Sequence, residues 1–164
     1  MSTPRARTRP QPRPVAGRRV ARAAVLLLLV FSVAVGLLTA LQRTLLYHPG
    51  EVAPAQAQRE ATQRRLRLWP AREGAPWRGL VADPTGVSPR GTVAVLHGNA
   101  GSAWERSWYR DALAPLGYRV VLLEYAGYGG RPGELSEHAL VTDAAESLRL
   151  LADEFGHPLY VLGE

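Results

Sequence analysis

The sequence contains no cysteine and no lysine, and only 2 of its 164 residues are phenylalanine. Without cysteine, these residues can form no disulfide framework, thiolate metal cluster or cysteine nucleophile. Paired carboxylates and a His-x-x-x-His spacing are also missing. We therefore expect neither a metal site nor another cofactor.

Acidic residues are missing from residues 1–22, which hold seven of the 20 arginines. Residues 23–164 carry 13 arginines and 14 acidic residues, so the basic character of the chain comes from its first 22 residues. Basic residues in a Pro/Arg-rich arm are not typical of a folded nucleic-acid-binding face, and we expect no nucleic-acid partner. The arm also lacks apolar periodicity, which predicts disorder over residues 1–22.

A long uncharged run begins at Ala23 and ends at Gln42. As a helix with a rise of about 1.5 Å per residue it would span roughly 30 Å, the thickness of the hydrocarbon core of a bilayer. Seven arginines precede the run, whereas only Arg43 and Arg59 follow it closely. This asymmetry predicts a single-pass cell-membrane protein with a cytoplasmic N-terminus and the remaining chain outside the cytoplasm.

Two other interpretations of the same run remain open. A cleaved signal peptide has a similar basic start, and Ser32-Val33-Ala34 or Ala34-Val35-Gly36 could form a small-residue cleavage site. A buried core helix is the other interpretation, although such helices rarely stay uncharged for this length. Because the apolar run continues past both cleavage sites, we favour a retained membrane anchor.

The chain after the anchor divides into a juxtamembrane connector, residues 43–63, and a domain, residues 64–164. Two short strands are predicted over residues 65–69 and 77–82. Continuous apolar runs then occur at residues 92–96, 120–123 and 159–162. Runs without alternation are typical of parallel strands that are covered on both faces.

Helices are predicted between these apolar runs. Ser102 and Glu105 fit a capping box, and Trp104, Trp108, Ala112 and Leu116 follow at a spacing of four before Gly117. A second apolar stripe consists of Leu140, Ala144, Leu148, Leu151 and Phe155. Strands and helices that alternate in this way predict an α/β domain with an open, mostly parallel sheet and helices on both faces.

Ligands of open α/β sheets bind at the carboxyl ends of the strands, so the loops after the apolar runs are the candidate site. The first loop is His97-Gly98-Asn99-Ala100-Gly101, where glycine allows backbone N–H groups to face an anion. It lacks the Lys-Ser/Thr ending of a P-loop and the spacing of a dinucleotide site. The second loop covers residues 124–133, and the third segment is Gly163-Glu164.

These three segments, in this order, resemble the α/β-hydrolase superfamily. With the N-terminal anchor and Leu45-Leu46-Tyr47-His48-Pro49, they are most similar to its membrane-anchored serine aminopeptidase-like branch. In that family the last strand leads into the nucleophile elbow G-x-S-x-G, and Gly163 and Glu164 match its first two positions. The resemblance therefore implies an N-terminal fragment that ends just before the elbow serine, with no catalytic triad residue in this chain.

The resemblance implies a serine hydrolase of esters, thioesters or amides in the complete protein, with a small-molecule or lipid-like acyl substrate and an inactive fragment. The backbone N–H of Asn99, presented by Gly98, would be one donor of the oxyanion hole, and Gly98→Val would distort the turn and test this role. His97, Ala100 and Gly101 complete the motif. Two alternatives are a non-catalytic, membrane-anchored binding module and a superfamily member with an aspartate nucleophile.

Overall fold

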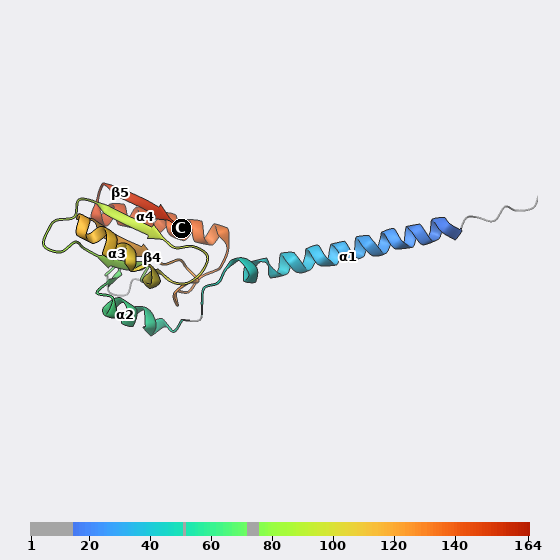
Figure 1. The fold of residues 1–164 in the computed structure, drawn as a ribbon, viewed down its shortest axis with the longest axis horizontal. Helices are drawn as coiled ribbons and strands as arrows, with labels where there is room; N and C mark the ends of the chain where they lie inside the picture. Colours follow the sequence, from blue (N-terminus) through green and yellow to red (C-terminus); the bar gives the residue numbers. More distant parts are fainter. Residues whose placement is uncertain (1–14, 51, 72–75) are drawn as a thin grey trace, which may run out of the picture. The chain divides into compact units, whose positions relative to one another are not determined.

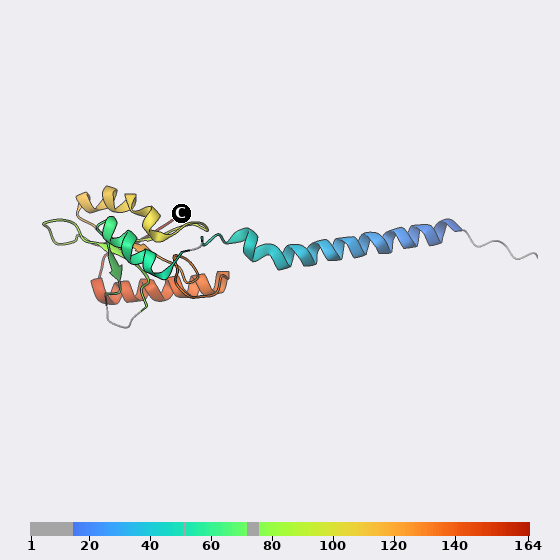
Figure 2. The ribbon, with the colours of Figure 1, turned by 90° about the horizontal axis from the view of Figure 1, so that it is seen from below.

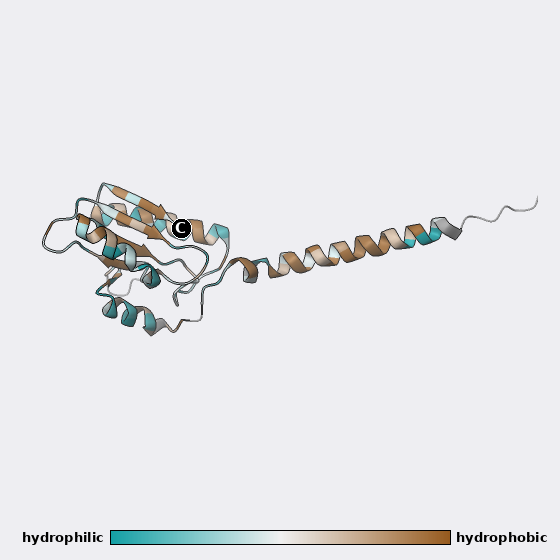
Figure 3. Ribbon diagram, viewed as in Figure 1, coloured by the Kyte–Doolittle hydropathy of each residue, from teal (hydrophilic) through white to brown (hydrophobic). Residues whose placement is uncertain are grey.

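A computed structural model describes residues 15–50, 52–71 and 76–164 of the chain. The chain forms two compact units, of which the first ends at Gln42 and the second spans Arg43–Glu164. Helix α1 (Val15–Leu46) begins in the first unit and ends in the second, and it contains a 26-residue apolar stretch, Gly17–Gln42, with no buried residues in its most apolar window. Figure 3 shows this helix in brown along most of its length. By length and composition it could cross a membrane.

Helix α1 starts earlier than the sequence predicts. The sequence predicts disorder for residues 15–22, whereas the structure has them in the first turns of α1. Helix formation is cooperative, so the long apolar segment extends into neighbouring residues of good helix propensity such as Ala21 and Arg22. The rest of the predicted arm, residues 1–14, lies outside the described residues.

The second unit is built on a mixed sheet, shown in Figure 1. Its five described strands are β1 (Arg67–Trp69), β2 (Gly79–Ala82), β3 (Thr92–Leu96), β4 (Arg119–Leu123) and β5 (Leu159–Gly163), in the order β1-β2-β4-β3-β5. Strand β3 pairs in parallel with β4 on one side and β5 on the other. Strands β1 and β2 pair antiparallel and continue the sheet beyond β4. The predicted strands are thus present with slightly different bounds.

Alternate residues of the strands point to two separate cores. Leu80, Val93, Val95 and Leu122 pack with alanines of α2 (Pro54–Gln63) and with Trp104, whereas Val81, Ala94, Val121 and Leu123 pack with Leu151 of α4 (Glu137–Phe155). Figure 2 shows α4 on one side of the sheet and α2 and α3 on the other. The predicted fold class, a largely parallel α/β sheet with helices on both faces after an apolar N-terminal helix, is confirmed.

Helix α2 lies in the segment that we predicted as a connector, residues 43–63. Ala57 and Ala61 of this helix are buried in the core against the sheet. Pro54 stands at its first position, where a proline costs no hydrogen bond. The folded unit therefore begins before residue 64, the start of the predicted domain.

The predicted helix after Ser102 is broken into three pieces: η1 (Ala103–Arg106), α3 (Trp108–Leu113) and η2 (Ala114–Leu116). The capping box is confirmed, because the Ser102 N–H donates to the Glu105 carboxylate at 2.9 Å. The apolar stripe is wrong, since Trp104 is buried but Trp108 and Leu116 are more than half exposed. The break at Ser107 rotates the chain, so residues four apart no longer share a face.

Helix α4 agrees with its predicted stripe. Leu151 is fully buried, and Leu148 and Phe155 pack against the same core. The helix is capped by the Ser136 hydroxyl, which accepts from the Ala139 N–H at 3.3 Å, and it ends at Gly156 as expected. One helix thus covers the face of β3 and β4 that α2 and η1 leave open.

Candidate functional site

The candidate site lies where β3, β4 and β5 end. Leu96 pairs with Leu123 on one side and with Gly163 on the other, so the three strands terminate at the same edge of the sheet. The residues that follow are His97, Glu124 and Glu164. The structure therefore brings together the three segments that the sequence analysis selected, as parallel strands require.

His97 is buried beneath its own loop. Its Nε2 lies 2.7 Å from Glu124 Oε1, its Nδ1 lies 2.8 Å from the carbonyl oxygen of Gly98, and the side chain is almost completely buried. The rings of Tyr125 and Tyr128 contact the imidazole edge-on, with centroids 4.9 and 5.2 Å away. Because both ring nitrogens have partners, His97 supports the loop and offers no free nitrogen to a substrate.

Both ring nitrogens of His97 lie within hydrogen-bond distance of an oxygen. A carbonyl oxygen can only accept, so Nδ1 donates to Gly98. The second contact joins Nε2 to the Glu124 carboxyl group, and both side chains are almost completely buried. The polar atoms of the pair therefore have the partners that burial requires.

Glu124 holds both ends of the first loop. Its Oε1 contacts His97, and its Oε2 accepts from the Ala103 N–H at 2.9 Å. The second loop passes close over the carboxylate at Gly129, where an added Cβ would lie 2.2 Å from Glu124 Oε2 and where φ is +56°. Only glycine fits at this position. Loops 97–103 and 124–131 are thus packed on a single buried carboxylate.

An ion-pair network fixes the second loop on α4. Arg131 donates through both terminal nitrogens to Asp143, at 2.8 and 2.9 Å, and also bonds the carbonyl oxygen of Glu124. Arg78 contacts the same carboxylate at 2.9 Å, and the Ala126 N–H donates to it at 3.0 Å. Burial alone would raise the pKa of Asp143, but the hydrogen bonds and charge of Arg131, with the smaller effects of Ala126 and Arg78, hold it below its ordinary value.

Asn99 is anchored by its side chain and its carbonyl group. Its Nδ2 donates to the carbonyl oxygen of Leu46 at 2.8 Å, and its carbonyl oxygen accepts from the Tyr128 hydroxyl at 3.0 Å and the His48 N–H at 2.9 Å. Within the described part of the chain, its own N–H donates to no protein group. The Asn99 N–H, which the sequence predicts as a donor to an anion, is therefore available to a ligand.

The glycine that shapes the turn is Gly101 and not Gly98. Gly101 has φ of +81°, and an added Cβ would lie 2.1 Å from Glu105 Oε2 and 2.6 Å from Arg106 Nη1. At Gly98 the backbone is not left-handed, and an added Cβ would meet only the Cβ of Glu164, at 4.0 Å. A Cβ is thus excluded sterically at Gly101 and not at Gly98, and the distortion expected from the larger side chain of Gly98→Val stays a prediction.

Glu164 continues β5 beside the loop. Its N–H donates to the carbonyl oxygen of Leu96 at 3.1 Å, and Arg106 Nε donates to its carboxylate at 3.0 Å. Burial raises the pKa of Glu164, but the hydrogen bond and charge of Arg106 outweigh this effect, helped by the Gly98 amide and the Tyr109 hydroxyl, and the pKa is lowered. The carboxylate is therefore the favoured form, held against the loop that contains Gly98.

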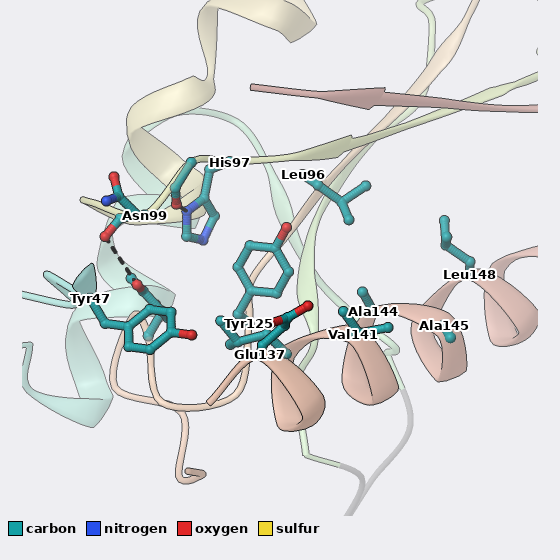
Figure 4. A pocket seen from close by; sticks show the side chains of 13 residues that line it. Tyr47, Leu96, His97, Asn99, Tyr125, Glu137, Val141, Ala144, Ala145 and Leu148 are labelled. Carbon is teal, nitrogen blue, oxygen red and sulfur yellow. Dashed lines mark hydrogen bonds between the residues drawn. The ribbon is translucent and has the colours of Figure 1, made fainter. Parts of the chain in front are cut away.

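A cavity of about 540 Å³ opens beside His97, Gly98 and Asn99. Figure 4 shows the labelled side chains of α4 along one side of the cavity and the His97–Asn99 loop along another. The wall from α4 and β3 contains Glu137 and is otherwise apolar, with Leu96, Leu140, Val141, Ala144, Ala145 and Leu148. Within the described residues no cluster of His, Asp and Glu has the arrangement of a metal site. The cavity suits an uncharged group next to a backbone donor.

The sequence analysis missed the three side chains that hold the loops, Glu124, Arg131 and Arg106. Glu124 carried a usable signal, because it follows β4 as His97 follows β3, and parallel register makes such residues neighbours. No sequence signal indicates Arg106 or Arg131, because their partners lie 58 and 12 residues away and no periodicity predicts how those segments are oriented.

No family profile matches the chain. It is 32% identical over 136 residues to an uncharacterized protein of Mycobacterium tuberculosis, covering 81% of this chain and 48% of that protein. It is 35% identical over 74 residues to the lysophosphatidylserine lipase ABHD12 of Danio rerio, covering 43% of this chain and 19% of the lipase. The chain thus spans about half the length of the mycobacterial relative and a smaller part of the lipase.

Among solved structures, an alpha-beta hydrolase from Vibrio vulnificus matches with a TM-score of 0.41 and 18% identity. The match covers 70% of this chain and 49% of that one.

Proposed function

We propose that this chain is the N-terminal part of a membrane-anchored α/β hydrolase of the serine aminopeptidase-like branch, in which a serine directly after Glu164 attacks an acyl substrate. The observation that carries the proposal is the position of the His97–Gly101 loop beside the end of β5. Leu96 and Gly163 are paired, and Gly98 lies next to Glu164. A nucleophile in the next position would stand close to the free N–H of Asn99.

The proposed chemistry requires a donor for a transient negative charge. When the serine oxygen bonds to the carbonyl carbon, the carbonyl oxygen becomes negative, and the Asn99 N–H and the N–H of the residue after the serine would both donate to it. Removing one such donor costs about 3 to 4 kcal/mol of activation free energy in measured cases. The family resemblance implies that the triad acid and histidine come later in the complete protein. His97 is no candidate for the base, because both of its ring nitrogens have partners.

The cavity supports an acyl substrate. Its apolar wall favours an uncharged hydrocarbon group, and only a few polar atoms, among them those of Tyr125 and Glu137, face it. The fish relative acts on lysophosphatidylserine according to its name, which agrees with a lipid-like or small-molecule ester as the substrate class. Esters, thioesters and amides all pass through the same anionic intermediate, so the proposal covers these three substrate types.

The membrane part of the proposal concerns α1. We infer that its apolar stretch is a retained anchor, with the arginine-rich N-terminus in the cytoplasm and the second unit outside. Because this sequence has no cysteine, single cysteines at Ser2 and at the exposed Ser88 can report sidedness. A membrane-impermeant maleimide added to intact cells should label the Ser88→Cys protein and not the Ser2→Cys protein, and the reverse pattern contradicts the inferred orientation.

Active-site labelling of the complete protein tests the proposed chemistry. A fluorophosphonate probe should label the wild type and a Ser88→Ala control, whereas replacing the serine expected directly after Glu164 with alanine should abolish both labelling and turnover of p-nitrophenyl butyrate. Labelling that persists in the alanine variant, or a residue other than serine at that position, contradicts the assignment. A folded protein with neither labelling nor turnover favours a non-catalytic binding module.

A further inference from the structure

Arg106 contacts three separate segments at the candidate site. Its Nε donates to Glu164 at 3.0 Å, its Nη2 to the carbonyl oxygen of Ala100 at 3.2 Å, and its Nη1 to Glu105 at 3.3 Å. These partners belong to the end of β5, to the loop after β3 and to η1. A planar guanidinium carries five N–H donors in a fixed geometry, which suits three acceptors at separate positions.

The loop leaves room for this guanidinium. The position that a Cβ of residue 101 would occupy lies 2.6 Å from Arg106 Nη1, so glycine at this position leaves the space to the guanidinium. Arg106 is 19% exposed and Glu164 is 27% exposed, which places the ion pair partly out of water. Such a pair is stronger and less screened by salt than one on the open surface.

Both donors of the proposed oxyanion hole are attached to segments that Arg106 holds. Asn99 directly precedes Ala100, and the second donor would follow the nucleophile, two positions after Glu164. The β3–β5 hydrogen-bond ladder fixes β5 as far as Gly163, and one further bond joins Glu164 to Leu96. Beyond that bond, the Glu164 carboxylate accepts from the Gly98 amide, and Arg106 joins the same carboxylate to Ala100.

Resting on the function proposed above, we propose that Arg106 is a positioning residue that sets the separation of the two oxyanion donors by joining Ala100 to Glu164. It touches neither the substrate nor the reacting atoms. Its loss should therefore lower kcat and leave KM nearly unchanged, because the donors bind the transition state and not the substrate ground state. A displacement of about 1 Å in such a site lowers the rate by on the order of 100-fold.

The test uses Arg106→Gln, Arg106→Lys and a matched control in the complete protein, with p-nitrophenyl butyrate as substrate. Arg119→Gln is the control, since Arg119 is 18% exposed, pairs with Asp83, and lies at the start of β4, away from the site. We expect kcat to fall about 10- to 100-fold in Arg106→Gln, less in Arg106→Lys, which keeps one charged contact, and little in Arg119→Gln. An unchanged kcat in Arg106→Gln, or an equal loss in the control, overturns the proposal.

Hydrogen exchange measured on the same proteins separates this proposal from the proposed function. If Arg106 holds the loop, the amides of Gly98 and Gly101, which donate to Glu164 and to the His48 carbonyl oxygen, should exchange at least about tenfold faster in Arg106→Gln and at the wild-type rate in Arg119→Gln. If the wild type hydrolyses no ester while this exchange difference is present, the proposed function fails but the positioning of the loop by Arg106 stands. Equal exchange in all variants refutes the role of Arg106, whatever the turnover.

Discussion

Two glycines three residues apart should respond oppositely to alanine. At Gly101 the backbone is left-handed, with φ of +81°, which costs an alanine about 1 to 2 kcal/mol. The new methyl carbon would also lie 2.1 Å from Glu105 Oε2, so the capping bond to Ser102 and the contacts of Arg106 must shift, at about 0.5 to 1 kcal/mol for each of these two changes. Gly101→Ala should therefore lower the free energy of unfolding by roughly 2 to 4 kcal/mol.

Gly98→Ala is the matched control for this prediction. Its methyl carbon would meet only the Cβ of Glu164, at 4.0 Å, which is an ordinary contact, and the backbone there is not left-handed. The free energy of unfolding should stay within about 0.5 kcal/mol of the wild type. Urea unfolding of the complete protein in detergent, followed by tryptophan fluorescence, measures both variants. A Gly101→Ala protein as stable as the wild type, or a larger loss at Gly98, would refute the steric reasoning.

Three further predictions concern the buried charges and the open sheet. Glu124→Leu leaves His97 and the Ala103 N–H without their partner and should cost about 3 to 5 kcal/mol in urea unfolding, whereas Glu124→Gln keeps a hydrogen-bonding group of similar size and should cost less; equal losses would contradict the hydrogen-bond argument. Folding lowers the pKa of Asp143, so the stabilisation from its ion pairs is complete above the ordinary pKa of 3.8 and is lost as the pH falls through the lower folded pKa. Asp143→Asn should reduce this loss of unfolding free energy at acid pH, and an unchanged loss would be evidence against the ion pairs. Residues 43–164 alone should show no cooperative melting by circular dichroism, because Tyr160 and Val161 of β5 are 49% and 58% exposed, and a sharp transition would disprove this.

The strands could be predicted because burial on two faces leaves a direct mark in the sequence. Residues 92–96 and 120–123 are continuous apolar runs, and the structure divides their side chains between two cores. Parallel pairing then places the following residues at one edge, which is why the candidate loops were found from the sequence. What the sequence could not predict was the geometry within those loops.

The errors have physical causes that periodicity does not detect. Trp104 and Trp108 are spaced for one helical face, but the turn at Ser107 leaves the second ring exposed and stacked on Tyr109. The sequence could not predict which of Gly98 and Gly101 is left-handed, because that difference lies in the backbone angles. The predicted boundaries of the arm and the connector were wrong, because α1 and α2 extend into these segments and helix formation is cooperative.

The single carboxylate shared by the two loops has a consequence for how this region can be altered. Grafting residues 97–103 from another protein, without residues 124–131, would leave the buried acid facing a foreign partner or none. Chimeras that move both stretches together should tolerate the exchange, and those that move only one should express poorly. A sequence change in either loop is thus limited by the contacts between the other loop and Glu124, whichever ligand the loops bind.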